Sequence, residues 1–286
     1  MASETTTRAA ITLTGPQETL LATLAGRCHD AQSAIPILGD KWAVELAERL
    51  DYDFSKLQVD PGKSAGICLR ARLLDIWTAE FLSRHRRATV VHLACGLDTR
   101  CQRVQHGPDV RWVDIDLPDV VKLRERIGSR PEGDYRLLGA DAAAPDAWLA
   151  SIPNDRPTIV VFEGLTMYMH EEHVRDLVQK AVARFSSHGG QLAFDCFGTV
   201  ALWLQSWMPA VEKTGSRLHF GADDGAVFRG WCSRLQTVDE LRPWGLVNYD
   251  PVLAAAAVPW GTRAVMWVFS WIPWVRDSGR MLRFEF

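Results

Sequence analysis

Carboxylate side chains follow three apolar runs in the middle of the chain, each at the point where the run ends. They are Asp116 after "VRWVDI", Asp141 after "YRLLGA" and Glu163 after "TIVVF". If the runs are parallel strands of one sheet, their carboxyl ends meet at one edge, where ligands bind. A single acid in such a position is usually a helix cap. Several at one edge predict a site that accepts hydrogen bonds from a ligand or pairs with its charges.

A fourth strand end carries a turn typical of nucleotide-binding folds. The stretch "VVHLACGLDTR", residues 90–100, leads from an apolar strand into Ala94, Cys95 and Gly96. Asp116 follows Gly96 by 20 residues, a usual distance to the acid that binds ribose hydroxyls. The further glycine of a dinucleotide loop is absent. Because S-adenosylmethionine has no pyrophosphate, the turn favours it over a nicotinamide dinucleotide.

The pattern around these residues predicts an α/β fold. Residues 16–50 and 64–85 have apolar positions at helical spacing. After them, strands and helices alternate, which predicts a doubly wound, mostly parallel sheet with helices on both faces. Seven strands are expected, the last antiparallel, at 88–94, 110–116, 135–140, 158–164, 191–197, 245–250 and 280–286.

One domain is expected over residues 16–286, after a flexible N-terminal segment at residues 1–15. A helical insert before the sixth strand is expected to contact the acceptor substrate. The parts of the domain are the N-terminal helical layer at 16–85, the cofactor-binding core at 86–198, the acceptor insert at 199–240 and the C-terminal part of the sheet at 241–286.

Composition argues against several classes of function. The chain has 286 residues and a formal net charge of −3, which does not favour nucleic acid as the main partner. Its 6 cysteines include no C-x-x-C pair and no histidine cluster accompanies them, so no metal site is expected. We expect free thiols in a reducing compartment. The first residues lack the apolar segment of a secretory signal, so a cytoplasmic location is predicted.

Residues 252–275 are long and apolar enough to suggest a membrane span, but two prolines and an arginine interrupt them. No stable membrane insertion is therefore expected, and a buried helix is predicted instead. Its aromatic face, at i, i+4 and i+7, consists of Trp267, Trp271 and Trp274. The tryptophans that could stack on an aromatic substrate, unless they simply pack in the core, are Trp203, Trp207, Trp267 and Trp271.

Four motifs together resemble the leucine carboxyl methyltransferase family, and within it the small-molecule branch typified by the tetracenomycin polyketide carboxyl methyltransferase. They are "VVHLACGLDTR", "VDIDLPDVVKLR", "LLGADAAAP" and "VVFEGLTMYMHEEHVRDLV". The resemblance covers residues 17 to about 200 and implies a class I, Rossmann-like fold that uses S-adenosylmethionine. The family usually has a glycine where this chain has Ala94. If that position needs a positive φ, alanine adds roughly 1 kcal/mol of strain.

The resemblance also implies roles for residues toward the methionine part of S-adenosylmethionine. Arg70, in "LRARLLD", would bind its carboxylate. Ala94, Cys95 and Gly96 would approach the methionine chain, and Glu163 would lie beside its amino group or the reacting centre.

The nucleoside and the acceptor have their own implied residues. Asp116 would hold the ribose, and Asp141 with Ala142 would face the adenine. Tyr168 would line the mouth of the site, and His29 falls where the family has a basic residue near the acceptor. Glu163, Tyr168 and His29 are thus the candidates for a direct part in catalysis.

The resulting hypothesis is an S-adenosylmethionine-dependent O-methyltransferase that acts on a carboxylate of a small, acidic, polyketide-like metabolite. A carboxylate is ionised at neutral pH and needs no general base, in agreement with the lack of an obvious catalytic dyad. One alternative is hydroxyl methylation with His170 or His173 as base; another is a cyclase that binds S-adenosylmethionine without methyl transfer. A monomer or homodimer is expected.

Overall fold

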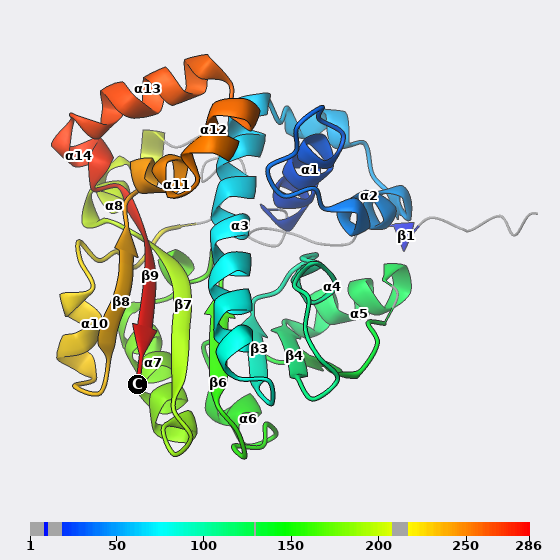
Figure 1. The fold of residues 1–286 in the computed structure, drawn as a ribbon, viewed down its shortest axis with the longest axis vertical. Coiled ribbons are helices and arrows are strands. Elements are labelled where there is room, and N and C mark those ends of the chain that lie inside the picture. The colour runs from blue at the N-terminus through cyan, green and yellow to red at the C-terminus, as the bar shows by residue number, and fades with distance from the viewer. Residues whose placement is uncertain (1–8, 11–18, 129, 208–216) are drawn as a thin grey trace, which may run out of the picture.

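One seven-stranded sheet organises the molecule (Figure 1). The computed structural model describes residues 9–10, 19–128, 130–207 and 217–286. The strand order is β5-β4-β3-β6-β7-β9-β8, and β9 is antiparallel to both of its neighbours. The strands are β3 (Thr89–Leu93), β4 (Arg111–Asp116), β5 (Asp134–Gly139), β6 (Thr158–Phe162), β7 (Gly190–Phe197), β8 (Gln236–Leu241) and β9 (Gly279–Glu285). The predicted doubly wound, mostly parallel sheet is confirmed, and its switch point lies between β3 and β6.

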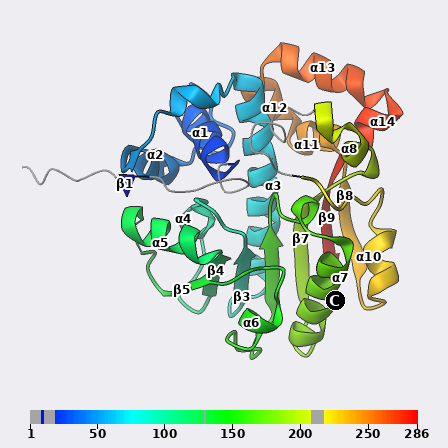
Figure 2. The same cartoon turned by 180° about the vertical axis from the view of Figure 1, so that it is seen from behind.

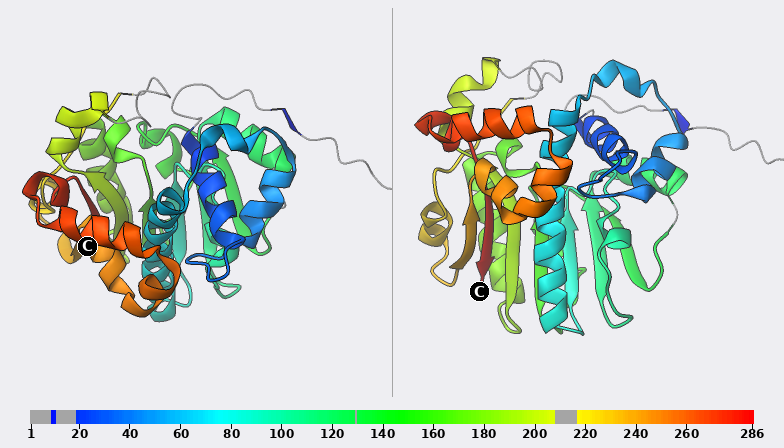
Figure 3. Two further views of the ribbon diagram at one scale, coloured as in Figure 1. Left: turned by 90° about the horizontal axis from the view of Figure 1, so that it is seen from above. Right: turned by 45° about the horizontal axis from the view of Figure 1, so that its top comes forward.

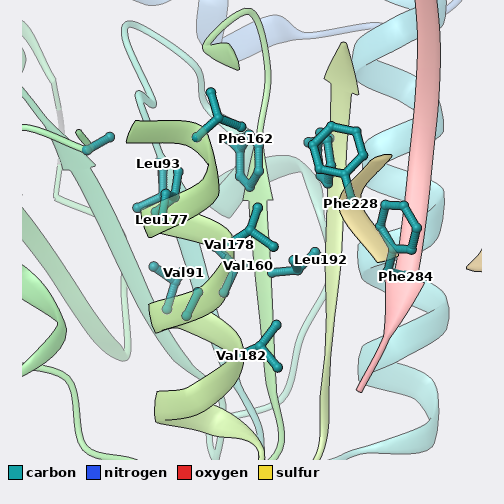
Figure 4. Close-up of a cluster of buried hydrophobic side chains, with 14 of the residues drawn as sticks. Val91, Leu93, Val160, Phe162, Leu177, Val178, Val182, Leu192, Phe228 and Phe284 are labelled. Atoms are coloured by element: carbon teal, nitrogen blue, oxygen red, sulfur yellow. The ribbon is translucent and has the colours of Figure 1, made fainter. Parts of the chain in front are cut away.

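Helices cover both faces of the sheet. They are α3 (Pro61–Arg84), α4 (Arg100–Arg103), α5 (Pro118–Ile127), α6 (Asp146–Leu149), α7 (Glu171–Phe185) and α10 (Ala226–Trp231). Because side chains alternate along a strand, Val90 packs with Trp77 of α3, whereas Val91 packs with Val178 of α7 on the other face. Figure 2 shows α7 on the face opposite α3, and Figure 4 shows the apolar cluster under α7.

The N-terminal helical layer lies over the turn that follows β3. It consists of α1 (Thr19–Ala31), α2 (Lys41–Glu48), the strand pair β1 (Ala9–Ala10) and β2 (Leu50–Asp51), and the 3-10 helix η2 (Phe54–Leu57). Leu24 of α1 and Leu46 of α2 share a buried cluster with Leu97 of the turn. Of the segment expected to be flexible, residues 9–10 form β1, and the rest lies outside the described residues.

A second group of helices lies beyond the same end of the sheet (Figure 3). It comprises α8 (Thr199–Leu204), η4 (Gln205–Trp207), α11 (Pro243–Tyr249), α12 (Pro251–Ala257), α13 (Trp260–Ser270) and α14 (Pro273–Arg276). The strand predicted at 245–250 is wrong, because these residues form most of α11. Pro243 starts this helix, and Val247 packs in a cluster with Leu69 of α3.

The sixth strand of the sheet along the chain is β8, and all of it except Leu241 lies within the range assigned to the acceptor insert. It is an edge strand that pairs only with β9, and none of its residues is buried. Its sequence "QTVDEL" therefore carries little of the apolar signal by which a strand is recognised.

The prediction of a buried helix at 252–275 is also wrong. The stretch forms α12, α13 and α14, and α13 contains no buried residue. Trp267 is 52% exposed and Trp271 is 73% exposed. Trp203 of α8 is 86% exposed, and the side chain of Trp207 lies outside the described residues. Within the described part of the chain, no helix has the length and apolar character to cross a membrane.

Candidate active site

The turn after β3 is held against the end of β4 by Asp116. Its Oδ2 accepts a hydrogen bond from the Gly96 N–H at 2.6 Å, and its Oδ1 accepts one from the Leu117 N–H at 2.7 Å. Gly96 has a φ of 51°, which glycine adopts freely, but Ala94 also has a positive φ, of 49°. The condition for strain at Ala94 is therefore met, since a side chain at such a φ costs roughly 1 kcal/mol.

The environment of Asp116 suits a ligand that offers hydroxyl groups. Burial raises the pKa of its carboxyl, although the Gly96 and Leu117 N–H groups act in the opposite direction. Each oxygen has a lone pair left after these backbone bonds. A diol such as that of ribose could therefore donate to the carboxylate, and hydrogen bonds of this charge-assisted kind are among the stronger ones.

Asp141 and Ala142 follow β5 at the next position along the sheet. Asp141 is exposed, and its Oδ1 accepts a hydrogen bond from the Ala143 N–H at 2.8 Å. Ala142 is buried in the core cluster on the α7 face. The carboxylate therefore shapes the loop, and its predicted contact with adenine stays a prediction.

Arg70 and Glu163 meet at the centre of the carboxyl edge. The Nε of Arg70, on α3, donates to Oε1 of Glu163 at 2.8 Å, just past the end of β6. The Nη2 of Arg100 donates to the second oxygen, Oε2, at 2.9 Å. Burial favours the neutral form of Glu163, but the charges of the two arginines outweigh it and hold its pKa below the usual value. The sequence prediction that Arg70 and Glu163 share a site is consistent with this geometry.

A buried ion network surrounds this pair, and most of it was not foreseen from the sequence. Its members, besides Arg70 and Glu163, are Arg27, Asp40, Asp75, Asp98, Arg100, Arg103 and Asp195. Asp98 and Arg100 stand in the motif "GLDTR", whose mixture of charges directly after a buried strand could have indicated them. The remainder come from α1, the N-cap of α2, α3, α4 and β7, so only the fold brings them together.

His92 lies beneath the turn and is committed to the same network. It is buried on β3, with Nε2 at 2.9 Å from Nη1 of Arg100 and Nδ1 at 3.3 Å from Oδ1 of Asp114. A guanidinium can only donate, so Nε2 accepts and the proton of the neutral ring is on Nδ1. The imidazole is thus a structural link between two charged groups.

The two remaining catalytic candidates lie in different surroundings. Tyr168 ends the 3-10 helix η3 (Thr166–Tyr168) and packs near Phe197. Burial raises the pKa of its hydroxyl, and the charge of Arg70 partly offsets this shift. His29 is exposed in the last turn of α1. In the part of the chain that the structure describes, His29 forms no ion pair with Glu163 or with the charged groups around Glu163.

The cysteines are free thiols, as expected, and four of them are buried. Burial raises the pKa of Cys95, in the turn, well above its usual value, which makes it a poor nucleophile. In the described ranges, no group of histidine, cysteine and carboxylate side chains is arranged to hold a metal ion.

Comparison with known proteins assigns the family. A model of leucine carboxyl methyltransferases matches residues 20–182. The chain belongs to this family. The tetracenomycin polyketide synthesis O-methyltransferase TcmP of Streptomyces glaucescens is 36% identical over 96% of this chain and 98% of its own length. The S-adenosylmethionine-dependent methyltransferase dpfgK of Gibberella zeae is 38% identical over 78% of this chain and 81% of its own.

As a leucine carboxyl methyltransferase family member, the chain is an S-adenosylmethionine-dependent O-methyltransferase. A DUF574-family protein of Streptomyces avermitilis shares the fold, with a TM-score of 0.58 at 14% identity over 91% of this chain and 96% of that one. The side chains at this edge fit the groups of S-adenosylmethionine. Arg70 offers a cation for its carboxylate and Glu163 offers an anion for its ammonium group. Asp116 offers acceptors for its ribose hydroxyls.

Proposed function

We propose that this O-methyltransferase methylates a carboxylate of a small, acidic, polyketide-like metabolite. The supporting observation is that the ionisable groups at the centre of the described site are already paired. Glu163 is bonded by Arg70 and Arg100, and His92 by Arg100. No base among them is free to take a proton from an acceptor. A carboxylate is ionised at neutral pH and needs none, whereas a phenol with a pKa near 10 does.

On the cofactor side, the residues act by holding one reactant in place. We assign Asp116 to the ribose, Arg70 to the methionine carboxylate and Glu163 to the amino group. When bound, S-adenosylmethionine supplies an electrophilic methyl group on a sulfonium. Fixing both reactants in line can lower a barrier by roughly 7–11 kcal/mol, so alignment is the main catalytic contribution of this chain.

On the acceptor side, apolar aromatic side chains dominate. Trp203 of α8, Trp267 of α13 and Trp271, the residue after α13, are exposed. Both helices lie beyond the end of the sheet where the proposed cofactor residues gather (Figure 3). Such surfaces can stack on a polycyclic acceptor. The likeness to TcmP, whose name refers to polyketide synthesis, supports this class of substrate. We further propose a cytoplasmic enzyme, monomeric or homodimeric, without a nucleic acid partner.

Hydroxyl methylation is the second candidate, and one observation favours it. The rings of His170, His173 and His219 form a cluster at the start of α7, with ring centroids of His170 and His219 4.1 Å apart. All three histidines are exposed, as expected for residues around the start of α7. Their position beside η3 would allow one of them to serve as a general base for an acceptor bound over Tyr168.

The dependence of the rate on pH separates these two functions. For a carboxylate acceptor we expect a flat rate from about pH 6 to 9, a base-labile ester as product, and less than about a tenfold loss in His170→Ala and His173→Ala. A rate that rises through neutral pH and is lost in either variant, with an alkali-stable ether as product, would instead establish hydroxyl methylation. Recovery of unmethylated product with intact S-adenosylmethionine would indicate a cyclase.

A further inference from the structure

Asp195, on β7, contacts Arg70 through a different nitrogen atom from the one that bonds Glu163. Its side chain is 5% exposed, and its Oδ2 accepts a hydrogen bond from Nη1 of Arg70 at 3.1 Å. Its Oδ1 accepts one from the Gly164 N–H at 2.6 Å. Its backbone carbonyl accepts another from Oγ1 of Thr166 at 3.0 Å. Asp195 is therefore fixed to the segment between β6 and η3 and holds the guanidinium of Arg70 in one orientation.

Arg70 uses different nitrogen atoms for its two carboxylates. Nε bonds Glu163, and Nη1 bonds Asp195. If Arg70 receives the methionine carboxylate and Glu163 the ammonium group, the bond between Arg70 and Glu163 is exchanged for two bonds to the ligand. The bond from Nη1 to Asp195 can remain. The guanidinium plane would then be set by Asp195 before and after binding, which reduces the ordering cost of association.

The ion network also contains more acids than bases. It consists of 4 arginines and 5 carboxylates, which are Arg27, Arg70, Arg100, Arg103, Asp40, Asp75, Asp98, Glu163 and Asp195. The adjoining ion pair of Asp114 and Arg124 has no net charge, so it does not alter the excess of one negative charge in the network. Each carboxylate has an arginine neighbour, but one negative charge of the network is left without a neutralising positive charge. Burial makes such a surplus unfavourable, so a cationic ligand would complete the network.

We propose that Asp195 is a positioning residue for Arg70 and supplies the surplus negative charge by which the site prefers S-adenosylmethionine to S-adenosylhomocysteine. The two molecules present the same carboxylate, ammonium and nucleoside groups. They differ in the sulfonium, which makes the methyl donor a cation and leaves the product without net charge. A preference of this kind promotes exchange of product for fresh donor after each turnover.

This inference rests on the roles proposed above for Arg70 and Glu163, but not on the identity of the acceptor. Binary complexes with the methyl donor or its product can be measured without any acceptor. A failure of the carboxylate proposal would therefore leave the experiment unaffected. Conversely, unchanged discrimination in Asp195→Asn would overturn the charge role of Asp195 while the function of the enzyme stood.

Calorimetric titration of the full chain with each of the two ligands tests the proposal. In Asp195→Asn we expect the affinity for S-adenosylmethionine to fall about tenfold more than that for S-adenosylhomocysteine, because the site loses one negative charge and only the methyl donor is a cation. In Asp195→Glu the charge remains but is displaced. Both affinities should then fall by similar factors, so that their ratio is retained.

Asp239→Asn is the matched control, because it removes an ion pair with Arg283 elsewhere in the sheet. The affinity ratio should stay at the value of the unaltered enzyme. A wild-type ratio in Asp195→Asn would overturn the charge role. Unaltered affinities for both ligands in Asp195→Glu would overturn the positioning role.

The dependence on pH gives a readout that a merely structural role would not change. Burial raises the pKa of Asp195, while the charge of Arg70 lowers it. The charged or titratable groups that face it are Arg70 of α3, Glu163 after β6 and Tyr168 of η3. A protonated Asp195 contributes no charge, so the preference for the donor should increase with pH as Asp195 ionises. In Asp195→Asn the ratio should be flat, and an equal slope in both proteins would contradict the proposal.

Discussion

The two sides of the carboxyl edge are built in opposite ways. On the cofactor side, charged groups are buried and joined to one another, and Arg100 for example is fully buried with partners on Asp75 and Glu163. On the side of α13, large aromatic groups face outward and pack on little of the chain. Trp77 of α3 is fully buried, whereas Trp271 is 73% exposed.

This difference indicates how the two sides should respond to substitution. A buried ion pair depends on both partners, because removal of one leaves the other charged and desolvated. An exposed aromatic side chain contributes little to folding, so its loss should be felt by a binding partner instead. The four predictions below test the contrast, from the largest expected effect to the smallest.

Arg70→Met should abolish measurable binding of S-adenosylmethionine. It also removes the arginine partner of the buried Asp195 and leaves Glu163 with Arg100 alone, which should lower the free energy of unfolding by about 3–5 kcal/mol. Calorimetry and thermal unfolding would check both effects. Arg70→Lys keeps the charge but cannot bond two carboxylates from separate nitrogen atoms, so it should recover stability more than affinity. Full binding by Arg70→Met would contradict the assignment of this side.

Asp116→Ala should weaken S-adenosylmethionine binding by more than about tenfold, because a charge-assisted bond to a hydroxyl is lost. The turn at Gly96 also loses the acceptor for its N–H. Circular dichroism should show that the fold survives. Asp119→Ala, at an exposed acid of α5 paired with Lys122, is the control and should bind normally. Equal affinity in Asp116→Ala would remove this residue from the site.

Trp267→Ala and Trp271→Ala should each change the free energy of unfolding by less than about 0.5 kcal/mol. Each should raise the KM for the acceptor by about threefold to tenfold, the value of an aromatic contact, with unchanged affinity for S-adenosylmethionine. Trp77→Ala, in the core, should instead cost about 3–5 kcal/mol of stability. Acceptor kinetics that do not respond to either exposed tryptophan would place the acceptor elsewhere.

Ala94→Gly should have the smallest effect, and a favourable one. The positive φ of Ala94 costs roughly 1 kcal/mol that glycine avoids, while the greater freedom of glycine in the unfolded chain offsets roughly 0.4–1 kcal/mol of it. We expect equal or slightly higher stability and equal or up to about fivefold tighter cofactor binding. A clear loss of affinity would show that the alanine methyl group itself contacts the ligand.

The agreement between sequence and structure follows the strength of the apolar signal. The strands β3, β4, β6 and β7 lie within a residue or two of their predicted positions, because they are buried on both faces and read as continuous apolar runs. The edge strand β8 and the helix α11 were confused with each other. A strand at the edge of a sheet is little buried, so its sequence lacks the alternation of apolar and polar residues. A short helix with few buried residues shows no clear helical spacing of apolar positions.

The site residues also fall into two groups: those that a local motif indicates, and those that come from distant parts of the chain. Gly96 and Asp116 are linked by the spacing of one strand–turn–strand unit, and the structure shows them bonded. Asp195 and Asp75 carry no local signal at all, since an acid on β7 or α3 looks like any other until the strands are ordered.

The sequence by itself determined the class of the fold and the turn at Gly96 with the acid Asp116 at the end of the next strand. These properties follow from local periodicity and from motifs that lie along a single segment. Only the tertiary structure decided which charges neutralise one another and which tryptophans stay outside. Both depend on contacts between segments far apart in the chain, and apolar composition alone does not distinguish a helix packed in the core from one that presents its face to a ligand.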